Sequence, residues 1–523
     1  MDLLIINPRI MWFSSKSLIA NGPLTLASYL HEKGFNVKVL DDNTMYKKYS
    51  IKDFIDYINY HQAKIIGFSV STLNAYNSYA LVKELRKVFP KKIFIAGGLH
   101  SFDCSEEMIE QCFDIVFKGE AELAVEKFLN TLADYPHDNS NDIFYNNSFI
   151  TALEKIPGIR VTRNGKTLDT GMGEYIQDLD TLPFNNYDLV NLNDYIKSKY
   201  DHHAVTNQIL FQRGCPYNCT FCKSPIVSSK IRNNSAQYMM KQLKHRYDKF
   251  GLNNFFITDS NFTIDKNRLK EFFQLITSSD LLGKINFMIQ TSVTVSISDD
   301  EIEMLRSIGV TMYLIGVERF NDESRKLIKK AGTSEQVTTL IRKLHNHGVK
   351  TIVNILVNFP FETKKFIDSE AKYIEENLPY VSFIYINYVS PMPGTQVYKS
   401  DLTDNFKKWY LIKNIVNYRI IYYDIAYLVE GPVALNLNIF QLPQETITLM
   451  RRFKEKYQWK GSLRISKSLF LRTIIILDML LGKISYHIAK ISPLLEYIIF
   501  KPFKFFRLKG YKMFFNLFIA KHK

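Results

Sequence analysis

Short apolar runs alternate with amphipathic stretches along most of the chain, and this alternation constrains the fold more than any other feature. In the first 140 residues each apolar run has strand length and is followed by a stretch with helical spacing. Strands that alternate with helices predict a parallel sheet covered on both faces. We therefore expect an α/β fold that begins with a Rossmann-like (flavodoxin-like) domain over 1–140. Its expected strands lie at 3–7, 35–40, 64–70, 92–96 and 114–117.

A second alternating region follows a connector over 141–200, which lacks clear periodicity and has a hairpin signal at Asn164-Gly165. Six apolar runs between residues 201 and 400 alternate with helical stretches, which favours a partial (β/α)6 TIM-like barrel. Catalytic groups of such barrels lie at the carboxyl ends of the strands. The expected strands lie at 205–212, 254–258, 285–290, 311–316, 351–357 and 382–388.

The C-terminal region, 401–523, has a helical and basic pattern. Residues 451–523 hold 17 Lys or Arg and three Asp or Glu, which gives +14 of the net +15, and the first 450 residues hold 50 basic and 49 acidic side chains. Residues 494–518 mix Leu, Ile, Phe and Tyr with Lys and Arg, which suits a helix lying in a membrane interface. No nucleic-acid motif accompanies the charge, so we expect peripheral membrane contact rather than nucleic-acid binding. The apolar segment 469–481 is too short and too charged to predict a span.

Three of the five cysteines, Cys215, Cys219 and Cys222, lie within eight residues just after the first expected barrel strand. Clustered thiols suit a reducing compartment and metal ligation, whereas secreted proteins more often show spread pairs. The N-terminus has no signal-peptide pattern, so we expect a cytoplasmic protein. The isolated Cys104 and Cys112 are expected to be structural thiols.

The spacing C-x3-C-x2-C allows each thiolate to bind one iron of a [4Fe–4S] cluster. The fourth iron then has no protein ligand, and a small molecule can bind it through an amine and a carboxylate. S-adenosylmethionine carries both groups, and an electron from the cluster can break its C–S bond to give a 5′-deoxyadenosyl radical. Structural zinc is the alternative, with His202 or His203 as fourth ligand, although neither stands at a usual spacing.

The cysteine loop resembles that of radical S-adenosylmethionine enzymes, and four further segments resemble elements of this family in the same order. The resemblance implies that Cys215, Cys219 and Cys222 ligate the cluster. It also implies contacts to the cosubstrate by Phe221, Asp259 and Glu318. The five segments are 215–222, 257–262, 316–318, 360–363 and 391–395.

Three positions depart from that family pattern. Asn358 stands where the Gly-x-Pro-x-Glu-Thr element has its glycine. Arg319 follows Glu318 where a small residue is usual, and an arginine common near 290–292 is absent. These changes leave the cysteine loop intact and concern the surroundings of the cosubstrate.

The first 140 residues resemble the cobalamin-binding domain that precedes the barrel in one subfamily of these enzymes. The shared features are Pro8 after the first strand, Gly22 with Leu26, and three motifs at later strand ends. An Asp-x-His-x-x-Gly segment is missing, so a histidine ligand to cobalt of that kind is not implied. The same residues are also ordinary loop residues of any Rossmann-like sheet. Those implied to bind cobalamin are Ser69, Thr72, Gly97, Gly98, His100, Gly119 and Glu120.

The resemblance implies a cobalamin-dependent radical enzyme that transfers a methyl group to an unactivated carbon. A radical cyclisation or rearrangement without methyl transfer is the first alternative, and a non-enzymatic membrane-surface scaffold is the second. The expected partners are a small-molecule or lipid-like substrate and a reductant such as flavodoxin or ferredoxin.

Overall fold

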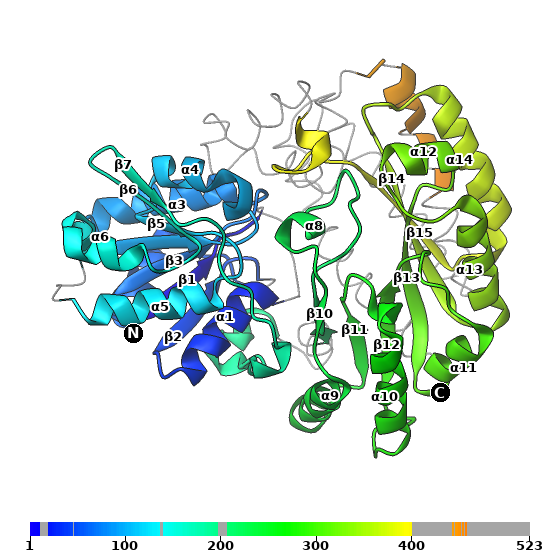
Figure 1. Ribbon diagram of the computed structural model, residues 1–523, viewed down its shortest axis with the longest axis horizontal. Coiled ribbons are helices and arrows are strands. Elements are labelled where there is room, and N and C mark those ends of the chain that lie inside the picture. The colour runs from blue at the N-terminus through cyan, green and yellow to red at the C-terminus, as the bar shows by residue number, and fades with distance from the viewer. Residues whose placement is uncertain are drawn as a thin grey trace.

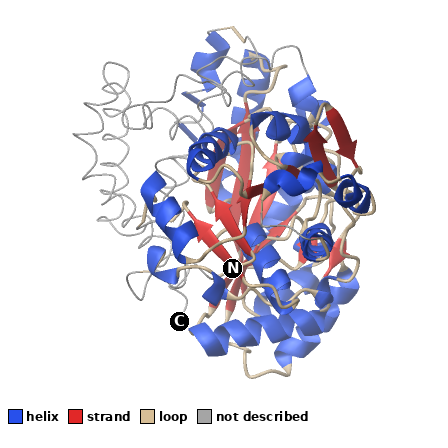
Figure 2. Cartoon of the chain, turned by 90° about the vertical axis from the view of Figure 1, so that its left-hand side faces the viewer, coloured by secondary structure: helices blue, strands red, loops and turns tan. Residues whose placement is uncertain are grey.

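The computed structural model describes most of the first 399 residues and four short stretches near residue 450. Its two large sheets, one of seven strands and one of six, lie beside each other, and helices surround both (Figures 1 and 2). The described residues are 1–10, 19–44, 47–135, 140–196, 207–399, 442–443, 445–450, 452–453 and 456–457.

The N-terminal sheet has the strand order β2-β1-β3-β4-β5-β6-β7, and its first five strands are parallel. The order 2-1-3-4-5 is that of flavodoxin-like sheets, which confirms the expected Rossmann-like fold. Ligands of such sheets bind beyond the carboxyl ends of the strands, where the order reverses between β1 and β3. The parallel strands are β1 (Leu3–Asn7), β2 (Val37–Asp41), β3 (Ile65–Ser69), β4 (Ile93–Gly97) and β5 (Ile115–Phe117).

Helices cover both faces of this sheet because every parallel strand buries side chains on both sides. Leu3 and Ile5 of β1 pack in the same core as α1 and α5, whereas Leu4 and Ile6 face the core that holds α2, α3 and α4. The apolar runs of the sequence reflect this two-sided burial. The helices are α1 (Asn21–Glu32), α2 (Ile51–Tyr60), α3 (Ala75–Val88), α4 (Ser101–Gln111) and α5 (Glu122–Ala133).

The connector adds an antiparallel hairpin to this sheet, formed by β6 (Ile159–Arg163) and β7 (Lys166–Asp169). Its turn residues Asn164 and Gly165 have φ values of 51° and 72°, so the expected Asn-Gly hairpin is confirmed. The short helix α6 (Asn147–Leu153) precedes it. The domain limits 1–140, 141–200, 201–400 and 401–523 stay predictions.

The second sheet is the expected partial barrel of six parallel strands, in the order β15-β14-β13-β12-β11-β8. Each strand lies within about two residues of its expected position, except the first. The strands are β8 (Gln208–Ile209), β11 (Asn254–Ile257), β12 (Asn286–Thr291), β13 (Val310–Glu318), β14 (Lys350–Val357) and β15 (Phe383–Tyr388).

The first barrel strand, expected over 205–212, is much shorter in the structure. Its β8 ends at Ile209, because the backbone N–H of Phe211 donates to the Asp259 carboxylate (2.6 Å) instead of to a neighbouring strand. The chain continues as β9 (Gln212–Arg213), which pairs in antiparallel fashion with β10 (Arg232–Asn233). The cysteine loop therefore starts from this small ribbon.

The barrel helices begin at capping residues that the sequence supplies. The side chains of Ser235, Ser298, Thr333 and Thr363 each accept the backbone N–H three residues later, which satisfies a free donor at the helix start. The helices are α8 (Ser224–Val227), α9 (Ala236–Phe250), α10 (Lys266–Thr277), α11 (Asp299–Ser307), α12 (Asp322–Leu327), α13 (Ser334–Asn346) and α14 (Lys364–Asn377).

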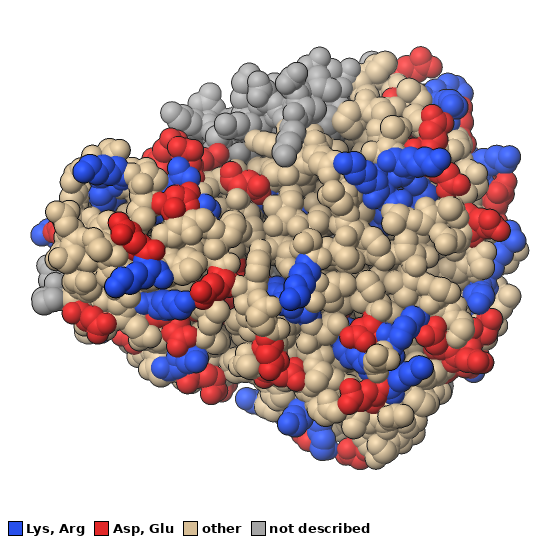
Figure 3. All heavy atoms as spheres, viewed as in Figure 1, with Lys and Arg blue, Asp and Glu red and all other residues tan. Residues whose placement is uncertain are grey.

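Most of the basic C-terminal region, including the proposed interface segment 494–518, lies outside the described residues. Residues 445–450 are helical. Among the described residues, no helix combines the length and the apolar character needed to cross a membrane. Lys and Arg are interspersed with Asp and Glu over the face drawn in Figure 3, in line with the balanced charge of the first 450 residues.

Candidate active site

The cysteine loop lies between β9 and α8, beside the carboxyl ends of the barrel strands. Cys219 is 9% exposed, and Cys215 and Cys222 are half-buried. The Cys215 N–H donates to the Ser228 carbonyl (3.0 Å), so the loop closes on the segment after α8. Helix α8 lies between the two sheets (Figure 1), which places the thiols near both domains.

Neighbouring barrel segments hold the loop from the other side. The Thr220 N–H donates to the Ile328 carbonyl (3.0 Å), and the Thr220 carbonyl accepts from the Val397 N–H (3.2 Å). The hydroxyl groups of Tyr217 and Thr294 are also hydrogen-bonded to each other. The segments after β12, α12 and β15 thus fix the loop although they are far apart in sequence.

Burial raises the pKa of Cys215, and it raises the pKa of Cys219 to about 11, against the opposing effect of Lys330 on both. The Ser224 N–H points at the Cys222 Sγ (3.4 Å), as expected for a donor to a thiolate. Thiols with a raised pKa become thiolates when a metal binds them, because the metal replaces the proton.

The donor set fits an iron–sulfur cluster better than one zinc ion. Four ligands about 3.8 Å apart surround a single tetrahedral zinc with sulfur ligands. Among the described residues, only His100, Cys104 and Glu107 bring three potential ligand atoms within 4.8 Å of one another, so the loop thiols are spaced more widely. Cys215, Cys219 and Cys222 would hold the cluster, and the alternative zinc ligands His202 and His203 lie outside the described residues.

Two of the three side chains expected to contact S-adenosylmethionine lie beside the cysteine loop. The Phe221 ring packs edge-on against Phe359, with centroids 5.9 Å apart. Glu318 ends β13 with a φ of 64°, and its side chain, 13% exposed, turns back over Gly316 with Lys330 Nζ 3.8 Å away. Burial raises the pKa of Glu318, which a cationic ligand would offset. Both roles stay predictions.

Asp259, the third of these side chains, is fully buried and already has protein partners. Its carboxylate accepts the Phe211 N–H (2.6 Å) and lies 3.4 Å from the guanidinium of Arg268. Burial raises its pKa, and the charge of Arg268 opposes that change. These contacts give Asp259 a structural task at the end of β8, and its cosubstrate role stays a prediction.

The departures at Asn358 and Arg319 belong to one buried turn. Asn358 has a φ of 70°, which asparagine tolerates better than most other residues with a side chain. Its N–H donates to Glu362 Oε2 (2.9 Å), and the same carboxylate pairs with Arg319. Arg319 is 0% exposed and lies over the Phe359 ring (5.1 Å). The sequence alone marks Asn358 and Arg319 as unusual, but it cannot show that both bond the same carboxylate, that of Glu362.

We predict that Asn358→Gly leaves the free energy of unfolding almost unchanged, whereas Asn358→Val lowers it by about 2 kcal/mol. The reason is that a left-handed φ disfavours side chains, and β-branched ones most of all. Urea unfolding of the two variants measures the difference. Equal stability of both variants would show that residue 358 does not need this φ.

Five of the residues expected to bind cobalamin meet at the carboxyl ends of β3 and β4. The Val70 N–H donates to the Gly97 carbonyl (2.7 Å), and the His100 N–H donates to the Val70 carbonyl (3.0 Å). Gly98 has a φ of 107°, and a Cβ there would lie 2.6 Å from the Val70 carbonyl oxygen, so no side chain fits. The structure thus joins two loops, 69–72 and 97–100, into one surface.

The His100 ring is buried, and both of its nitrogens have protein partners. Nδ1 lies 3.0 Å from the Thr72 hydroxyl, and Nε2 lies 3.1 Å from Glu107 Oε1. The Tyr79 hydroxyl donates to the same carboxylate oxygen (2.7 Å). His100 therefore braces the loop, and a cofactor role for it stays a prediction.

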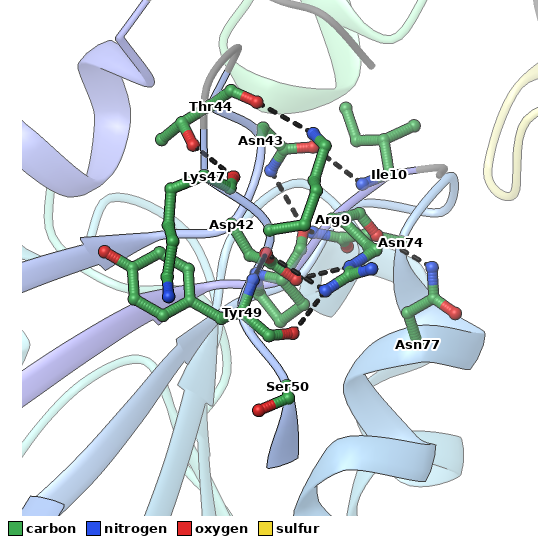
Figure 4. A network of polar contacts seen from close by, with 12 residues as sticks. Arg9, Ile10, Asp42, Asn43, Thr44, Lys47, Tyr49, Ser50, Asn74 and Asn77 are labelled. Atoms are coloured by element: carbon green, nitrogen blue, oxygen red, sulfur yellow. Dashed lines mark hydrogen bonds and ion pairs between the residues drawn. The ribbon is translucent and has the colours of Figure 1, made fainter. Parts of the chain in front are cut away.

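A polar network that sequence reasoning missed closes the neighbouring edge, after β1 and β2 (Figure 4). Arg9 Nε donates to Asp42 (2.5 Å), and its Nη2 donates to the Tyr49 carbonyl (2.5 Å). Asn74 Nδ2 reaches across from the end of β3 to the Pro8 carbonyl (3.0 Å). The only signal of this network in the sequence is that a basic residue, Arg9, follows one strand and an acidic residue, Asp42, follows the next.

Gly119 and Glu120 follow β5, next to these loops, but the Glu120 carboxylate faces the barrel domain. Its oxygens lie 3.0 Å from Arg213 and 2.5 Å from Arg232. Gly119 packs against the Gly173 backbone. The cobalamin roles of both residues stay predictions, and the contacts give Glu120 a task between the domains.

The strand-end surface fits a large planar cofactor. Leu99, between the half-buried Gly98 and the buried His100, is 51% exposed and offers an apolar contact. The loops 69–72 and 97–100 would hold cobalamin there. The cysteine loop of the barrel lies next to this edge, since Lys223 pairs with Asp103 of α4.

Comparison with protein families assigns both domains. Residues 18–129 match the B12 binding domain, and residues 209–373 match the Radical SAM superfamily.

Curated relatives and solved structures agree with this assignment. An uncharacterized methyltransferase of Pyrococcus horikoshii is 22% identical over 73% of this chain and 78% of its own. An anaerobic magnesium-protoporphyrin IX monomethyl ester cyclase of Synechocystis is 25% identical over 69% of both chains. The structure of the radical S-adenosylmethionine methyltransferase TsrM from Kitasatospora setae, with cobalamin and a [4Fe-4S] cluster bound, has a TM-score of 0.62 at 15% identity, covering 76% of this chain and 77% of its own. The fold is therefore shared.

Proposed function

Because this chain joins a B12-binding domain to a radical SAM domain, we propose that it is a cobalamin-dependent methyltransferase that acts on an unactivated carbon. One observation carries the proposal: the cysteine loop of the barrel adjoins the strand-end loops of the N-terminal domain. When bound, the cluster supplies the electron that cleaves S-adenosylmethionine, and cobalamin supplies the methyl group. Both cofactors would then face one reaction space.

The residues of the chain bind, orient and shield the reactants. Cys215, Cys219 and Cys222 would anchor the cluster at the barrel mouth. Glu318 would offer a carboxylate to the cationic amine of S-adenosylmethionine, and Phe221 would contact its adenine. Burial raises the pKa of Glu318, and Lys330, with its Nζ 3.8 Å away, opposes that rise.

The substrate is a small molecule, and we propose that it is largely apolar. An apolar cluster made only of strand residues lines the barrel sheet on the face opposite to the main core. Neighbouring strands place these side chains level with one another, as Phe256 with Met288 and Ile352 with Phe383. The three buried members of the cluster, Met288, Met312 and Ile352, are each the third residue of their strand, so the cluster lies away from the carboxyl ends that adjoin the cysteine loop. The apolar, lipid-like substrate is therefore proposed from the basic, apolar tail 451–523. The cluster consists of Phe256, Met288, Met312, Leu314, Ile352, Phe383 and Tyr385.

A flavodoxin-like or ferredoxin-like reductant, a cytoplasmic location and peripheral membrane contact through 451–523 complete the proposal. They follow from the need for an electron and from the basic, apolar tail.

Anaerobic reconstitution tests the methyltransferase proposal. We expect the protein to bind cobalamin and, under reduction, to form 5′-deoxyadenosine together with a cell-extract product that is one methylene unit heavier. Extract from cells that lack the enzyme is the control. A product without the added methylene would favour the cyclase or rearrangement alternative, and failure to bind cobalamin would remove methyl transfer by this route.

We predict that Glu318→Gln weakens S-adenosylmethionine binding about 10-fold to 100-fold, because a hydrogen bond between charged groups contributes about 1.5–3 kcal/mol. Asp259→Asn is the matched control. It leaves Arg268 without its buried partner, so it should lower the unfolding temperature and leave affinity within about twofold. Equilibrium dialysis of the cluster-loaded protein measures both. A similar loss of affinity in both variants would assign Asp259 to the cosubstrate.

A further inference from the structure

The N-terminal domain contacts the cysteine loop through ion pairs on both sides of it. Arg213 stands two residues before Cys215, and Lys223 directly follows Cys222. Their acidic partners follow two adjacent strands of the N-terminal sheet: Asp103 lies in the first turn of α4, after β4, and Glu120 lies in the segment between β5 and α5. The loop that carries all three thiols is therefore held at both ends by the other domain.

The upstream clamp joins Arg213 and Arg232 to Glu120 and Glu122. Arg213 Nη1 lies 3.0 Å from Glu120, and its Nη2 donates to Glu122 (2.7 Å). Arg232 donates to both oxygens of Glu120, at 2.5 and 3.0 Å. Two-pronged pairs of this kind restrict orientation as well as distance.

All four side chains of the upstream clamp are largely buried, with exposures of 18% and 4% for Arg213 and Arg232 and 9% and 8% for Glu120 and Glu122. Burial alone would raise the pKa of Glu120, but the bonds to Arg232 and Arg213 lower it below its usual value. A buried ion-pair network adds little to stability compared with apolar packing, whereas it does restrict how two surfaces meet.

The downstream clamp joins Lys223 to Asp103, three residues after His100. Lys223 also donates to the Pro393 carbonyl (2.8 Å). Asp103 packs directly on Gly394, where a Cβ would lie 2.1 Å from its Oδ1, so a side chain at 394 would push the Asp103 carboxylate away; the φ of 84° at this position also favours glycine. The clamp thus brings together α4, the cysteine loop and the segment after β15.

We propose that the N-terminal domain positions the iron–sulfur cluster through these two clamps, with Asp103, Glu120 and Glu122 as positioning residues. The inference rests on the proposed function only in that the cysteine loop holds the cluster. It explains why Glu120 turns away from the cofactor edge and toward the barrel. It also means that the segments following β4 and β5, through Asp103, Glu120 and Glu122, are in direct contact with residues that flank the three thiols.

The test measures the cluster itself in the full-length protein. Asp103→Asn and Glu122→Gln each remove one charge without changing side-chain shape, and Glu84→Gln is the control. Glu84 pairs with Lys87 (2.6 Å) on α3 of the N-terminal domain and is 50% exposed. We record the rate of iron loss to a chelator and the electron paramagnetic resonance spectrum of the reduced cluster, with and without S-adenosylmethionine.

We expect iron loss to become about 10-fold faster in both clamp variants, because groups that orient metal ligands typically affect metal retention by this amount or more. The spectrum should change as well, whereas Glu84→Gln should match the wild type. Lys223→Arg retains the charge and should keep slow iron loss, whereas Lys223→Met should not. Two further measurements make a purely structural role visible: the unfolding temperature of each apo variant and the iron content before chelation.

Wild-type iron loss and spectra in both clamp variants would overturn the proposal. So would faster loss explained wholly by a lower unfolding temperature of the apo protein. Failure of methyl transfer is a separate outcome. Iron loss and the cluster spectrum can be compared between the wild type and the clamp variants even when no methylated product forms.

Discussion

Replacing Cys219 with alanine is expected to abolish cluster loading and, with it, cleavage of S-adenosylmethionine. Two thiols cannot replace three, and the loop around Cys219 is held by Ile328 and Val397, so it cannot move to recruit another ligand. Iron retention should fall at least about 100-fold, beyond the usual effect of residues that only orient the ligands. Iron and sulfide analysis of anaerobically purified protein measures the loss directly.

Cys112→Ala is the matched control for this experiment. Cys112 ends α4 in the N-terminal domain, and burial raises the pKa of its thiol to about 12, so it behaves as an inert apolar side chain. Its loss should leave the iron content unchanged. Full iron content in Cys219→Ala would contradict the assignment of the loop, and so would loss of iron in Cys112→Ala.

Breaking the buried pair of Arg319 and Glu362 is expected to have the largest effect on stability. Both side chains are 0% exposed, and Arg319→Met leaves the Glu362 carboxylate buried without its charged partner. Removal of one member of such a pair costs about 3–5 kcal/mol. Urea unfolding of the apo protein measures this free energy.

A double variant separates the pair from simple packing. Arg319 Nε and Nη1 have no hydrogen-bond partner among the described residues, so changing both residues removes the two buried charges together with the unpaired guanidinium nitrogens. Arg319→Met with Glu362→Gln should therefore recover most of the lost stability. Arg306→Met, which breaks an exposed pair with Glu303 (3.0 Å), should have no measurable effect. A double variant as unstable as Arg319→Met would point to packing over Phe359 as the cause.

Most of the fold could be predicted because strand and helix periodicity is a local property. Five of the six barrel strands and all five parallel strands of the N-terminal sheet lie where apolar runs stand in the sequence. The exception, the strand expected over 205–212, ends early because Asp259, about fifty residues later, takes the N–H of Phe211. A local sequence pattern cannot predict that a side chain so far along the chain accepts this backbone hydrogen bond.

The site was predictable to different degrees. The spacing of Cys215, Cys219 and Cys222 limits what three thiols can bind before any folding is considered, since a loop this short keeps them together. The partners of Glu120 and Arg319 were not predictable. In the sequence, Glu120 resembles part of a cofactor-binding motif, and Arg319 stands where the family pattern has a small residue. The structure shows that Glu120 pairs with Arg213 and Arg232 and that Arg319 pairs with Glu362.

The sequence by itself determined two domains, their order and the three-thiol loop, because each of these depends on residues close together in the chain. Tertiary structure alone decided which charges meet: Glu120 with Arg213, Asp103 with Lys223, and Arg319 with Glu362. Those pairings depend on how separate elements dock, and a side chain of given charge can satisfy many partners until the docking selects one.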